Sequence, residues 1–521
     1  MAALKGKVKE ANSPKIVRSF NTIFWIVSSL VCFLAYCLQP SLFKSSRQPW
    51  FGDIELKPKV KVVDWKIFAA NSAANEAAGN VSHEDDEVRN RIVREVVKLR
   101  QPVILKNSPV TEWPAIELWA DDAYLTSKVA KLNSVKQTSS KLFVYHEDRK
   151  YSKYGEFGNT VSEKPFGVVE EVSTEDFLTL QLNMQYSGRL GLEETNDFGD
   201  NEILPLDEDA SPRKYLRVDD TPMSKNVFWL GQPNTTTSVH YDLQHNFVTQ
   251  VRGTRRFMIY PPSASFSLVP HPYHHPRFRQ SQLYYAETGG SSFWGRTTKE
   301  PVVADLEPGD LLYVPPFWWH RVESNSKGPS IQVNTWSPSD EESAFIEFVS
   351  SMPPTLVKNL WGTYRMLPYA KQYVLGVVTE VQKLFPSYFT AKGGPEEFIG
   401  QVIQAKYLSE GMTRRMIDVE PHLGCTDWKK SHCPKKTIVI TQADKDKMKE
   451  SAESLAHKFY SAVYANVTNP SDLDLQVADH YAGVVKAILS DFVENQLYML
   501  LANNDEHGNI CAVMRCMAQS A

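Results

Sequence analysis

The chain has 521 residues, which is more than one compact domain usually needs. Its apolar content of 42% and its charged content of 23% are ordinary for a globular protein. The net charge of −4 gives no sign of the basic surface that binds nucleic acid, so we expect no nucleic-acid partner.

The N-terminal segment has the pattern of a membrane anchor. Residues 1–19 are polar and basic, and an apolar run without charge then ends at Gln39-Pro40. With its flanks the run covers residues 20–43, enough for one transmembrane helix. A basic flank favours the cytosol, so we expect a single-pass type II membrane protein whose remaining chain is lumenal, in the endoplasmic reticulum, the Golgi or a later secretory membrane. A cleaved signal peptide and a buried soluble helix are the alternatives.

A lumenal location agrees with two other features. Three N-glycosylation sequons predict a glycoprotein, and they begin at Asn80, Asn234 and Asn466. Late cysteines at short spacing would form two local disulfides in an oxidising compartment, or stay free thiols in a reducing one. They are Cys425, Cys433, Cys511 and Cys516.

The rest of the chain divides into three parts. Residues 44–87 are polar and predict a stem or linker. Residues 88–338 begin with an amphipathic helix over 88–100 and continue in short strands, such as 101–106 and 142–145, that Pro, Gly and Asn interrupt. This pattern is typical of a β-barrel or sandwich.

Residues 339–521 change to the apolar spacing of helices. We expect a helical region that packs on the barrel or on a second copy of the chain. The predicted fold class is thus α+β, mainly β, with flanking helices and a C-terminal helical region, preceded by one transmembrane helix. The predicted late helices cover 341–352, 354–364, 369–385, 395–411, 445–464 and 473–501.

One stretch pairs an imidazole with a carboxylate. His240 and Asp242 are two residues apart on a predicted strand, so their side chains lie on the same face. Much later, His320 closes a segment that has the pattern of a turn, a buried strand and a Pro-stiffened exit. Two histidines and one carboxylate are the facial-triad ligands of non-haem iron, which leave metal positions open. Taken singly, His-x-Asp is more often a surface pair and His320 a core histidine.

Five motifs strengthen the first interpretation. They are His240-Tyr241-Asp242-x-x-x-Asn246-Phe247, Gly253-x-x-Arg256, His274-His275-Pro276-x-x-Arg279-Gln280-Ser281-Gln282, Pro308-Gly309-Asp310-x-Leu312-Tyr313-x-Pro315-x-x-Trp318-Trp319-His320 and Val333-Asn334-x-Trp336. Together they resemble the Jumonji C, cupin-type 2-oxoglutarate oxygenases, and within that family the asparaginyl hydroxylase that acts on hypoxia-inducible factor. The resemblance covers roughly half of the chain.

The resemblance implies a double-stranded β-helix, or jelly roll, that holds Fe(II) through His240, Asp242 and His320 and takes 2-oxoglutarate as cosubstrate. Where the hydroxylase has a lysine for the far carboxylate, this chain has Arg255, which is longer but pairs well with a carboxylate. The other expected cosubstrate contacts are Thr237, Asn246, Asn334 and, on spacing alone, Tyr186.

The activity that the resemblance implies is hydroxylation of a protein side chain, with a homodimer formed through the C-terminal helices. Two other functions stay open at this point. One is a metal-binding cupin that acts as an interaction module without oxygenase turnover. The other is a cupin of another reaction class, such as a metal-dependent isomerase, although those usually carry more histidine ligands. The sequence does not separate hydroxylation from demethylation.

Overall fold

The chain divides into two compact units, Met1–Glu55 and Leu56–Ala521, and every described residue belongs to the second. The predicted cytosolic tail, the anchor, the first sequon and the four late cysteines lie outside the described residues. The computed structural model describes residues 59–67, 86–145, 167–180, 182–190, 203–211, 213–218, 224–271, 273, 277–283, 300–351, 366–389, 393–405 and 439–499.

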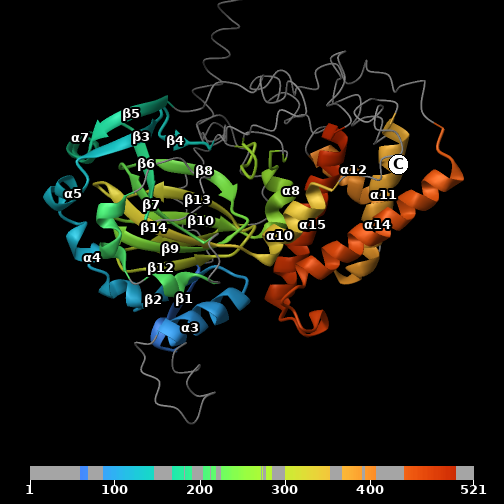
Figure 1. Ribbon diagram of the computed structural model, residues 1–521, viewed down its shortest axis with the longest axis horizontal. Coiled ribbons are helices and arrows are strands. Elements are labelled where there is room, and N and C mark those ends of the chain that lie inside the picture. Colours follow the sequence, from blue (N-terminus) through green and yellow to red (C-terminus); the bar gives the residue numbers. More distant parts are fainter. Residues whose placement is uncertain are drawn as a thin grey trace, which may run out of the picture. The chain divides into compact units, whose positions relative to one another are not determined.

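Two mixed sheets form the β-rich part of the described chain (Figure 1). Neighbouring strands run antiparallel except in two pairs, β1 with β2 and β4 with β8. The larger sheet has the order β1 (Lys61–Asp64), β2 (Val103–Lys106), β12 (Leu311–Val314), β9 (His245–Arg252), β14 (Ser330–Ser337), β7 (Lys225–Gly231), β6 (Met184–Arg189), β3 (Lys131–Gln137) and β5 (Gly167–Ser173). The smaller sheet has the order β11 (Val302–Leu306), β10 (Arg255–Tyr260), β13 (Trp319–Ser324), β8 (Thr236–Tyr241) and β4 (Leu142–Phe143).

A tight turn carries the chain from β11 in one sheet to β12 in the other. The backbone N–H of Asp310 donates to the carbonyl oxygen of Glu307 at 3.0 Å, and Gly309 has a φ of +90°. Proline followed by a glycine at positive φ is the sequence of a type II turn, because other residues are strained there. The turn and the buried strand predicted before His320 are therefore both present.

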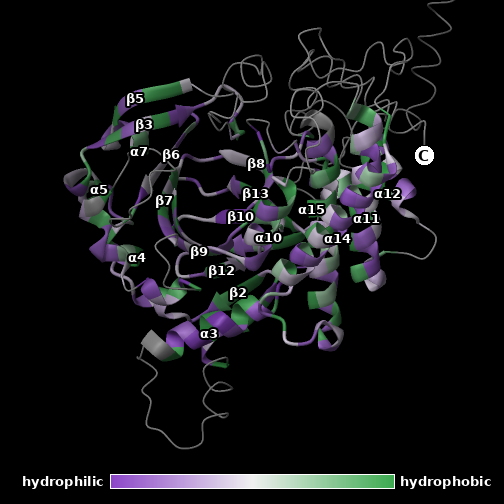
Figure 2. Cartoon of the chain, turned by 45° about the vertical axis from the view of Figure 1, so that its right-hand side comes forward, coloured by the Kyte–Doolittle hydropathy of each residue, from purple (hydrophilic) through white to green (hydrophobic). Residues whose placement is uncertain are grey.

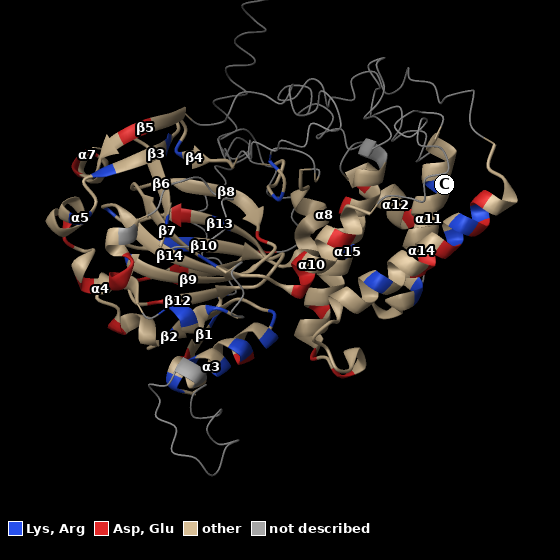
Figure 3. Cartoon of the chain, in the orientation of Figure 1, with Lys and Arg blue, Asp and Glu red and all other residues tan. Residues whose placement is uncertain are grey.

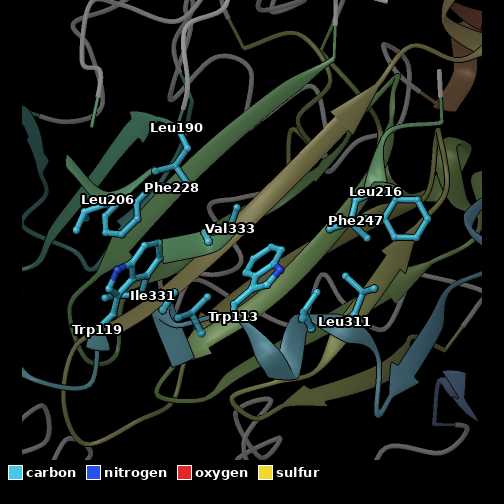
Figure 4. Close-up of a cluster of buried hydrophobic side chains, with 14 of the residues drawn as sticks. Trp113, Trp119, Leu190, Leu206, Leu216, Phe228, Phe247, Leu311, Ile331 and Val333 are labelled. Atoms are coloured by element: carbon cyan, nitrogen blue, oxygen red, sulfur yellow. The ribbon is translucent and has the colours of Figure 1, made fainter. Parts of the chain in front are cut away.

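The larger sheet buries its hydrophobic face under the N-terminal helices. Trp113 and Trp119 are 2% and 0% exposed, and the ring of Trp119 meets that of Phe228 on β7 at 5.3 Å in a T-shaped contact. Figure 4 shows both tryptophans against side chains from β7, β9, β12 and β14. Fully burying a large apolar side chain contributes about 1.5–3 kcal/mol, so this packing holds the N-terminal helices against the larger sheet.

Helices precede, interrupt and follow the strands. Among the described residues the early ones are α3 (Asp86–Lys98), α4 (Ala115–Leu118), α5 (Asp122–Lys128), α7 (Thr174–Thr179) and α8 (Ser265–Leu268). The late ones are α10 (Asp340–Val349), α11 (Leu367–Leu384), α12 (Pro395–Ile403), α14 (Gln442–Val463) and α15 (Leu475–Met499). The helices predicted near these positions are confirmed, whereas the one predicted over 354–364 lies outside the described residues. The predicted β-sheet core with flanking and C-terminal helices is confirmed. The predicted balance, mainly β, is wrong, because the described helices contain more residues than the described strands.

The late helices pack as one cluster through apolar faces, while their outer faces are polar (Figure 2). Phe348 of α10 stacks on Phe459 of α14 at 4.2 Å and contacts Phe492 of α15 at 4.8 Å. Local sequence fixes the starts of two of these helices. The Ser339 hydroxyl accepts from the backbone of Glu342 and begins α10, and Thr441 with Asp444 forms a capping box that begins α14.

The prediction of a membrane-spanning protein is contradicted by the described part of the chain. Within the described residues no helix combines the length and the apolar character needed to cross a membrane. The reason is charge: Figure 3 shows basic and acidic residues along α14, and α15 carries Asp479, Lys486, Asp491 and Glu494 within its 25 residues. This contradicts the predicted single-pass protein with a lumenal catalytic domain, although the predicted anchor at 20–43 itself lies outside the described residues. Glycosylation, which depended on that topology, has no support in the described part.

Candidate metal centre

Two neighbouring strands of the smaller sheet bring the predicted metal ligands together. His240 on β8 lies directly opposite His320 on β13, with ring centroids 4.2 Å apart. Asp242 follows the last residue of β8, and its Oδ2 is 3.7 Å from His320 Nε2. One ligand atom from each of the three side chains can be chosen so that all lie within 4.8 Å of one another, and all three residues are buried. Among the described residues, the structure thus collects two imidazoles and one carboxylate at a single point.

Hydrogen bonds fix which nitrogen of each imidazole faces that point. Nδ1 of His240 contacts the carbonyl oxygen of Ser238 at 2.8 Å, and Nδ1 of His320 contacts that of Trp318 at 3.0 Å. A carbonyl can only accept, so Nδ1 carries the proton in each neutral ring. Burial, with His320 nearby, lowers the pKa of His240 to about 3. The unprotonated Nε2 of His240 is therefore free for a metal, and a carbonyl on the other nitrogen is the usual support of a metal-binding histidine.

A chain of amides and one arginine orient Asp242. Asn246 donates to Asp242 Oδ2 at 3.1 Å, Asn334 donates to the Asn246 oxygen at 3.1 Å, and Gln332 donates to the Asn334 oxygen at 2.8 Å. From the other side, Arg279 Nη1 lies 3.3 Å from Asp242 Oδ1.

The same neighbours keep the carboxylate charged. Burial by itself raises the pKa of Asp242, but His320, His240, Arg279 and the Asn246 hydrogen bond together bring it below its usual value. The buried Asp242 is therefore an anion. This is the form that binds a metal.

Strained backbone surrounds the same carboxylate. Arg279 and Phe317 are non-glycine residues with φ of 68° and 62°, and the Phe317 N–H donates to the Asp242 carbonyl oxygen at 2.8 Å. Left-handed backbone at such residues costs on the order of 1–3 kcal/mol and clusters at functional sites.

The three ligands line a small, partly open pocket. Trp229, Phe257, Val322 and Trp336 supply its apolar walls. The predicted cosubstrate residues Thr237, Asn246, Arg255 and Asn334 line it together with the triad, and so do Tyr145, Gln185 and Gln332.

Arg255 is the cation of this pocket. It is 3% exposed, and its guanidinium donates to Ser330 Oγ at 2.9 Å and to the Ser330 carbonyl oxygen at 3.1 Å. No carboxylate of the described residues is paired with it. Burial lowers the pKa of Arg255 to about 9, so the group remains a cation near neutral pH. A buried cation without an internal anion is suited to an acidic ligand.

Glycine makes room for this side chain. A Cβ atom at position Gly231 would lie 3.1 Å from Arg255 Nη2 and 3.2 Å from the Ser324 hydroxyl. A Cβ at this position would therefore require the guanidinium and the Ser324 hydroxyl to shift by a few tenths of an ångström.

Tyr186, by contrast, does not join the others. It belongs to the hydrophobic core under the larger sheet, where its ring meets that of Phe228 at 6.3 Å, while its neighbour Gln185 lines the pocket. The two residues alternate because successive side chains of a strand point to opposite faces.

The sequence did not identify Tyr145, which supplies a hydroxyl-bearing ring to the pocket. Its ring meets that of His240 at 5.0 Å in a T-shaped contact. Gln280 holds its backbone from both sides: the Tyr145 N–H donates to Gln280 Oε1 at 2.7 Å, and Gln280 Nε2 donates to the Tyr145 carbonyl oxygen at 2.8 Å. Because these residues are 135 positions apart, spacing alone gave no signal for the pair.

The residues present fit a divalent metal of the non-haem iron class. Two imidazole nitrogens and one carboxylate oxygen match the 2-His-1-carboxylate donor set. Each ligand side chain also has a hydrogen-bond partner of the kind that usually orients a metal ligand. The buried Arg255 in the same pocket fits a second, anionic ligand.

Comparison with known proteins agrees with this chemistry. Residues 89–342 match a family model described as a cupin-like domain. The Jumonji C domain-containing protein 5 of Drosophila melanogaster is 28% identical over 255 residues, which are 45% of this chain and 54% of that protein. The lysine-specific demethylase JMJ31 of Arabidopsis thaliana is 29% identical over 30% of this chain and 28% of its own length. The tRNA wybutosine-synthesizing protein 5 of Gallus gallus is 26% identical over 48% of this chain and 74% of its own length.

The chain therefore spans about half the length of the Drosophila relative and less than a third of the Arabidopsis one. A solved cupin 2 domain-containing protein from Halorhodospira halophila matches 23% of this chain and 56% of its own, at 13% identity and a TM-score of 0.15, which carries no conclusion about the fold. Residues 89–342 are thus similar to a cupin-like domain, and Jumonji C proteins are among the relatives of the chain.

Proposed function

We propose that this protein is an Fe(II)- and 2-oxoglutarate-dependent oxygenase that hydroxylates a protein side chain. The observation that carries the proposal is the convergence of His240, Asp242 and His320 within 4.8 Å in a buried pocket. The closer likeness to the asparaginyl hydroxylase rests on the sequence motifs alone and is part of the proposal.

In this proposal the two Nε2 atoms and the Asp242 carboxylate hold the iron. When bound, iron and 2-oxoglutarate supply the oxidising chemistry that hydroxylates an unactivated C–H bond. Asn246, through its hydrogen bond, would hold the Asp242 carboxylate in place as a ligand.

Arg255 then receives the far carboxylate of 2-oxoglutarate. Its guanidinium is held by Ser330 and lies in the same pocket as the ligands. Thr237, Asn334 and Tyr145 line the space between them and would add hydrogen bonds to the cosubstrate. Trp229 and Phe257 add apolar walls to the same pocket.

The substrate class is the finer part of the proposal. One relative is named a lysine-specific demethylase and another a tRNA wybutosine-synthesizing protein. For this chain we favour a protein substrate, because its net charge of −4 lacks the cationic excess that RNA binding uses. A homodimer through the C-terminal helices likewise remains a prediction.

The position of Arg255 favours an oxygenase over a metal-binding interaction module. A module that keeps its metal for structure has no use for a buried cation beside the metal. Here Arg255 lines the pocket, 3% exposed and without a carboxylate among the described residues. Keeping such a group buried is costly unless a ligand compensates it.

The test is an anaerobic titration followed by turnover. The full chain is mixed with Fe(II), and 2-oxoglutarate is added while the visible charge-transfer absorption of the iron–keto acid complex is recorded. Oxygen is then admitted and succinate is measured. We expect saturable absorption and succinate formation, both lost in His240→Ala. If the protein bound neither iron nor 2-oxoglutarate, the proposal would be overturned.

A further inference from the structure

The residues around Asp242 contact two helices, α10 and α15, that follow the strands in sequence. Residues 241–245, here called the ligand turn, connect β8 to β9 and contain the carboxylate ligand. The hydroxyl of Tyr241 donates to Asp491 Oδ2 on α15 at 3.3 Å. Tyr241 and Asp491 are 2% and 1% exposed. This contact links the residue before the ligand to a helix 250 positions later.

The start of α10 holds the middle of the ligand turn. The Ser339 hydroxyl donates to the carbonyl oxygen of Leu243 at 2.6 Å, and the Gln244 side-chain amide donates to the Glu342 carboxylate. Ser339 also begins α10 by accepting from the backbone N–H of Glu342 at 3.0 Å. The first turn of α10 is therefore joined to the ligand turn by two hydrogen bonds.

A buried ionic cluster holds the end of the ligand turn. His245 Nε2 lies 3.5 Å from Arg100 Nη1, and Arg100 Nε pairs with Glu341 Oε1 of α10 at 2.8 Å. His480 of α15 contacts the same Glu341 oxygen through its Nε2 at 3.1 Å. All four side chains are buried, and the cluster joins β9 and the end of α3 to α10 and α15.

We propose that α10 and α15 position the metal ligand Asp242, with the Tyr241–Asp491 hydrogen bond as the main link. This inference rests on the proposed function, because it requires that Asp242 bind a metal. Asp242 lies beyond the end of β8, so the sheet alone does not fix its backbone as it fixes that of His240. Contacts to both neighbours of Asp242, Tyr241 and Leu243, restrict the carboxylate to one orientation. Tyr241 and Asp491 are thus positioning residues.

The test measures metal affinity instead of turnover. Co(II) is used as a probe of the site, and its visible ligand-field spectrum and dissociation constant are measured on the full chain. Tyr241→Phe keeps the ring, which stacks on Phe317 at 5.2 Å, and removes only the hydroxyl. We expect binding about 10-fold weaker with an altered spectrum, because outer partners of metal ligands typically contribute 10- to 100-fold in affinity.

Two further variants separate positioning from general stability. Asp491→Ala should weaken Co(II) binding similarly, and adding Tyr241→Phe to it should cause no further loss, because the contact is already absent. The control is Tyr388→Phe, which removes a hydroxyl that contacts Tyr464 within the C-terminal helices, remote from the ligand turn in sequence. This control should leave affinity and spectrum unchanged, even if it lowers the melting temperature.

The outcomes distinguish the two proposals. If the unmodified chain binds no Co(II), the metal site and with it the proposed function are overturned. If the unmodified chain binds Co(II) and Tyr241→Phe binds equally tightly with the same spectrum, the positioning role is overturned and the proposed function stands. The positioning role would also be overturned if Tyr241→Phe weakened Co(II) binding as much in the Asp491→Ala background as in the unmodified chain. The effect of the hydroxyl would then not depend on α15.

Discussion

Two regions of this molecule each bury an arginine, and they differ in what neutralises it. At the junction between the end of α3 and the start of α10, Arg100 pairs with Glu341 at 2.8 Å. In the metal pocket, Arg255 contacts only neutral partners among the described residues. Burial lowers the pKa of both, but the Glu341 carboxylate raises that of Arg100 above its usual range, whereas that of Arg255 falls to about 9.

This difference separates a structural cation from a binding cation. The junction carries its own anion, so its charges are satisfied within the fold. The pocket lacks one, so the fold alone leaves Arg255 poorly compensated and an acidic ligand completes it. The comparison makes opposite predictions for the two regions: changes at the junction should reduce stability, and changes in the pocket should reduce ligand binding.

The largest effect is expected at the junction. Glu341→Ala leaves Arg100 buried without its carboxylate, and breaking a buried pair in this way costs about 3–5 kcal/mol of unfolding free energy. Urea unfolding measures this loss. The matched control is Glu171→Ala, which breaks the exposed pair with Lys131 and should cost less than about 1 kcal/mol. Similar losses in the two variants would contradict the structural role of the junction.

In the pocket, Arg255→Met should separate binding from stability. Removing the cation that meets the far carboxylate should weaken 2-oxoglutarate binding by at least about 30-fold, since such pairs are worth roughly 2–5 kcal/mol. The unfolding free energy should stay unchanged or rise, because an uncompensated buried charge is lost. Calorimetric titration and urea unfolding check the two parts. Unchanged 2-oxoglutarate affinity would remove Arg255 from the binding site.

A smaller effect is expected from pH at the junction. Burial, reinforced by Arg100, lowers the pKa of His245 to about 3, whereas an unfolded histidine has a pKa of about 6.5. The unfolded state therefore takes up a proton that the folded state does not as the pH falls below about 6.5. The unfolding free energy is therefore highest, as far as His245 is concerned, above pH 6.5, and it falls toward pH 3. Between roughly pH 7.5 and pH 5.5 the fall is about 1.4 kcal/mol.

The measurement is urea unfolding of the unmodified chain and His245→Gln at both pH values. In the variant, the difference in unfolding free energy between the two pH values should be smaller by about that amount, because glutamine does not titrate. His457→Gln, at an exposed position on α14, is the control and should behave like the unmodified chain. An equal pH dependence in His245→Gln would show that this histidine is not the source.

The smallest effect concerns the hydroxyl that we assign to cosubstrate binding. Burial raises the pKa of Tyr145, so its hydroxyl stays protonated and can donate. Tyr145→Phe should weaken 2-oxoglutarate binding by about 3- to 10-fold, the value of one hydrogen bond. Tyr186→Phe is the control, because Tyr186 lies in the hydrophobic core. If Tyr186→Phe had the larger effect on affinity, the assignment of the hydroxyl to Tyr145 would be wrong.

The parts of the site that follow from local sequence could be predicted. The two-residue spacing of His240 and Asp242 encodes a shared strand face, and Pro308-Gly309 encodes the turn before the strand that leads to His320. Periodicity also identified the C-terminal helices, because their apolar faces repeat regularly.

The parts that depend on distant contacts could not be predicted. Gln280 holds Tyr145 across 135 residues, and Asp491 reaches Tyr241 across 250. Nothing in either local sequence marks these partners, since the contacts exist only once the chain has folded. The membrane prediction rested on one local apolar run, whereas no helix among the described residues has the length and apolar character to cross a membrane.

The most direct test of the central claim is a crystal structure of the full chain grown without oxygen, with Mn(II) as a stand-in for iron and 2-oxoglutarate. We predict the metal on His240 Nε2, His320 Nε2 and the Asp242 carboxylate, and the far carboxylate of 2-oxoglutarate on Arg255. A metal bound elsewhere, or a 2-oxoglutarate carboxylate that leaves Arg255 without an anion, would contradict the account.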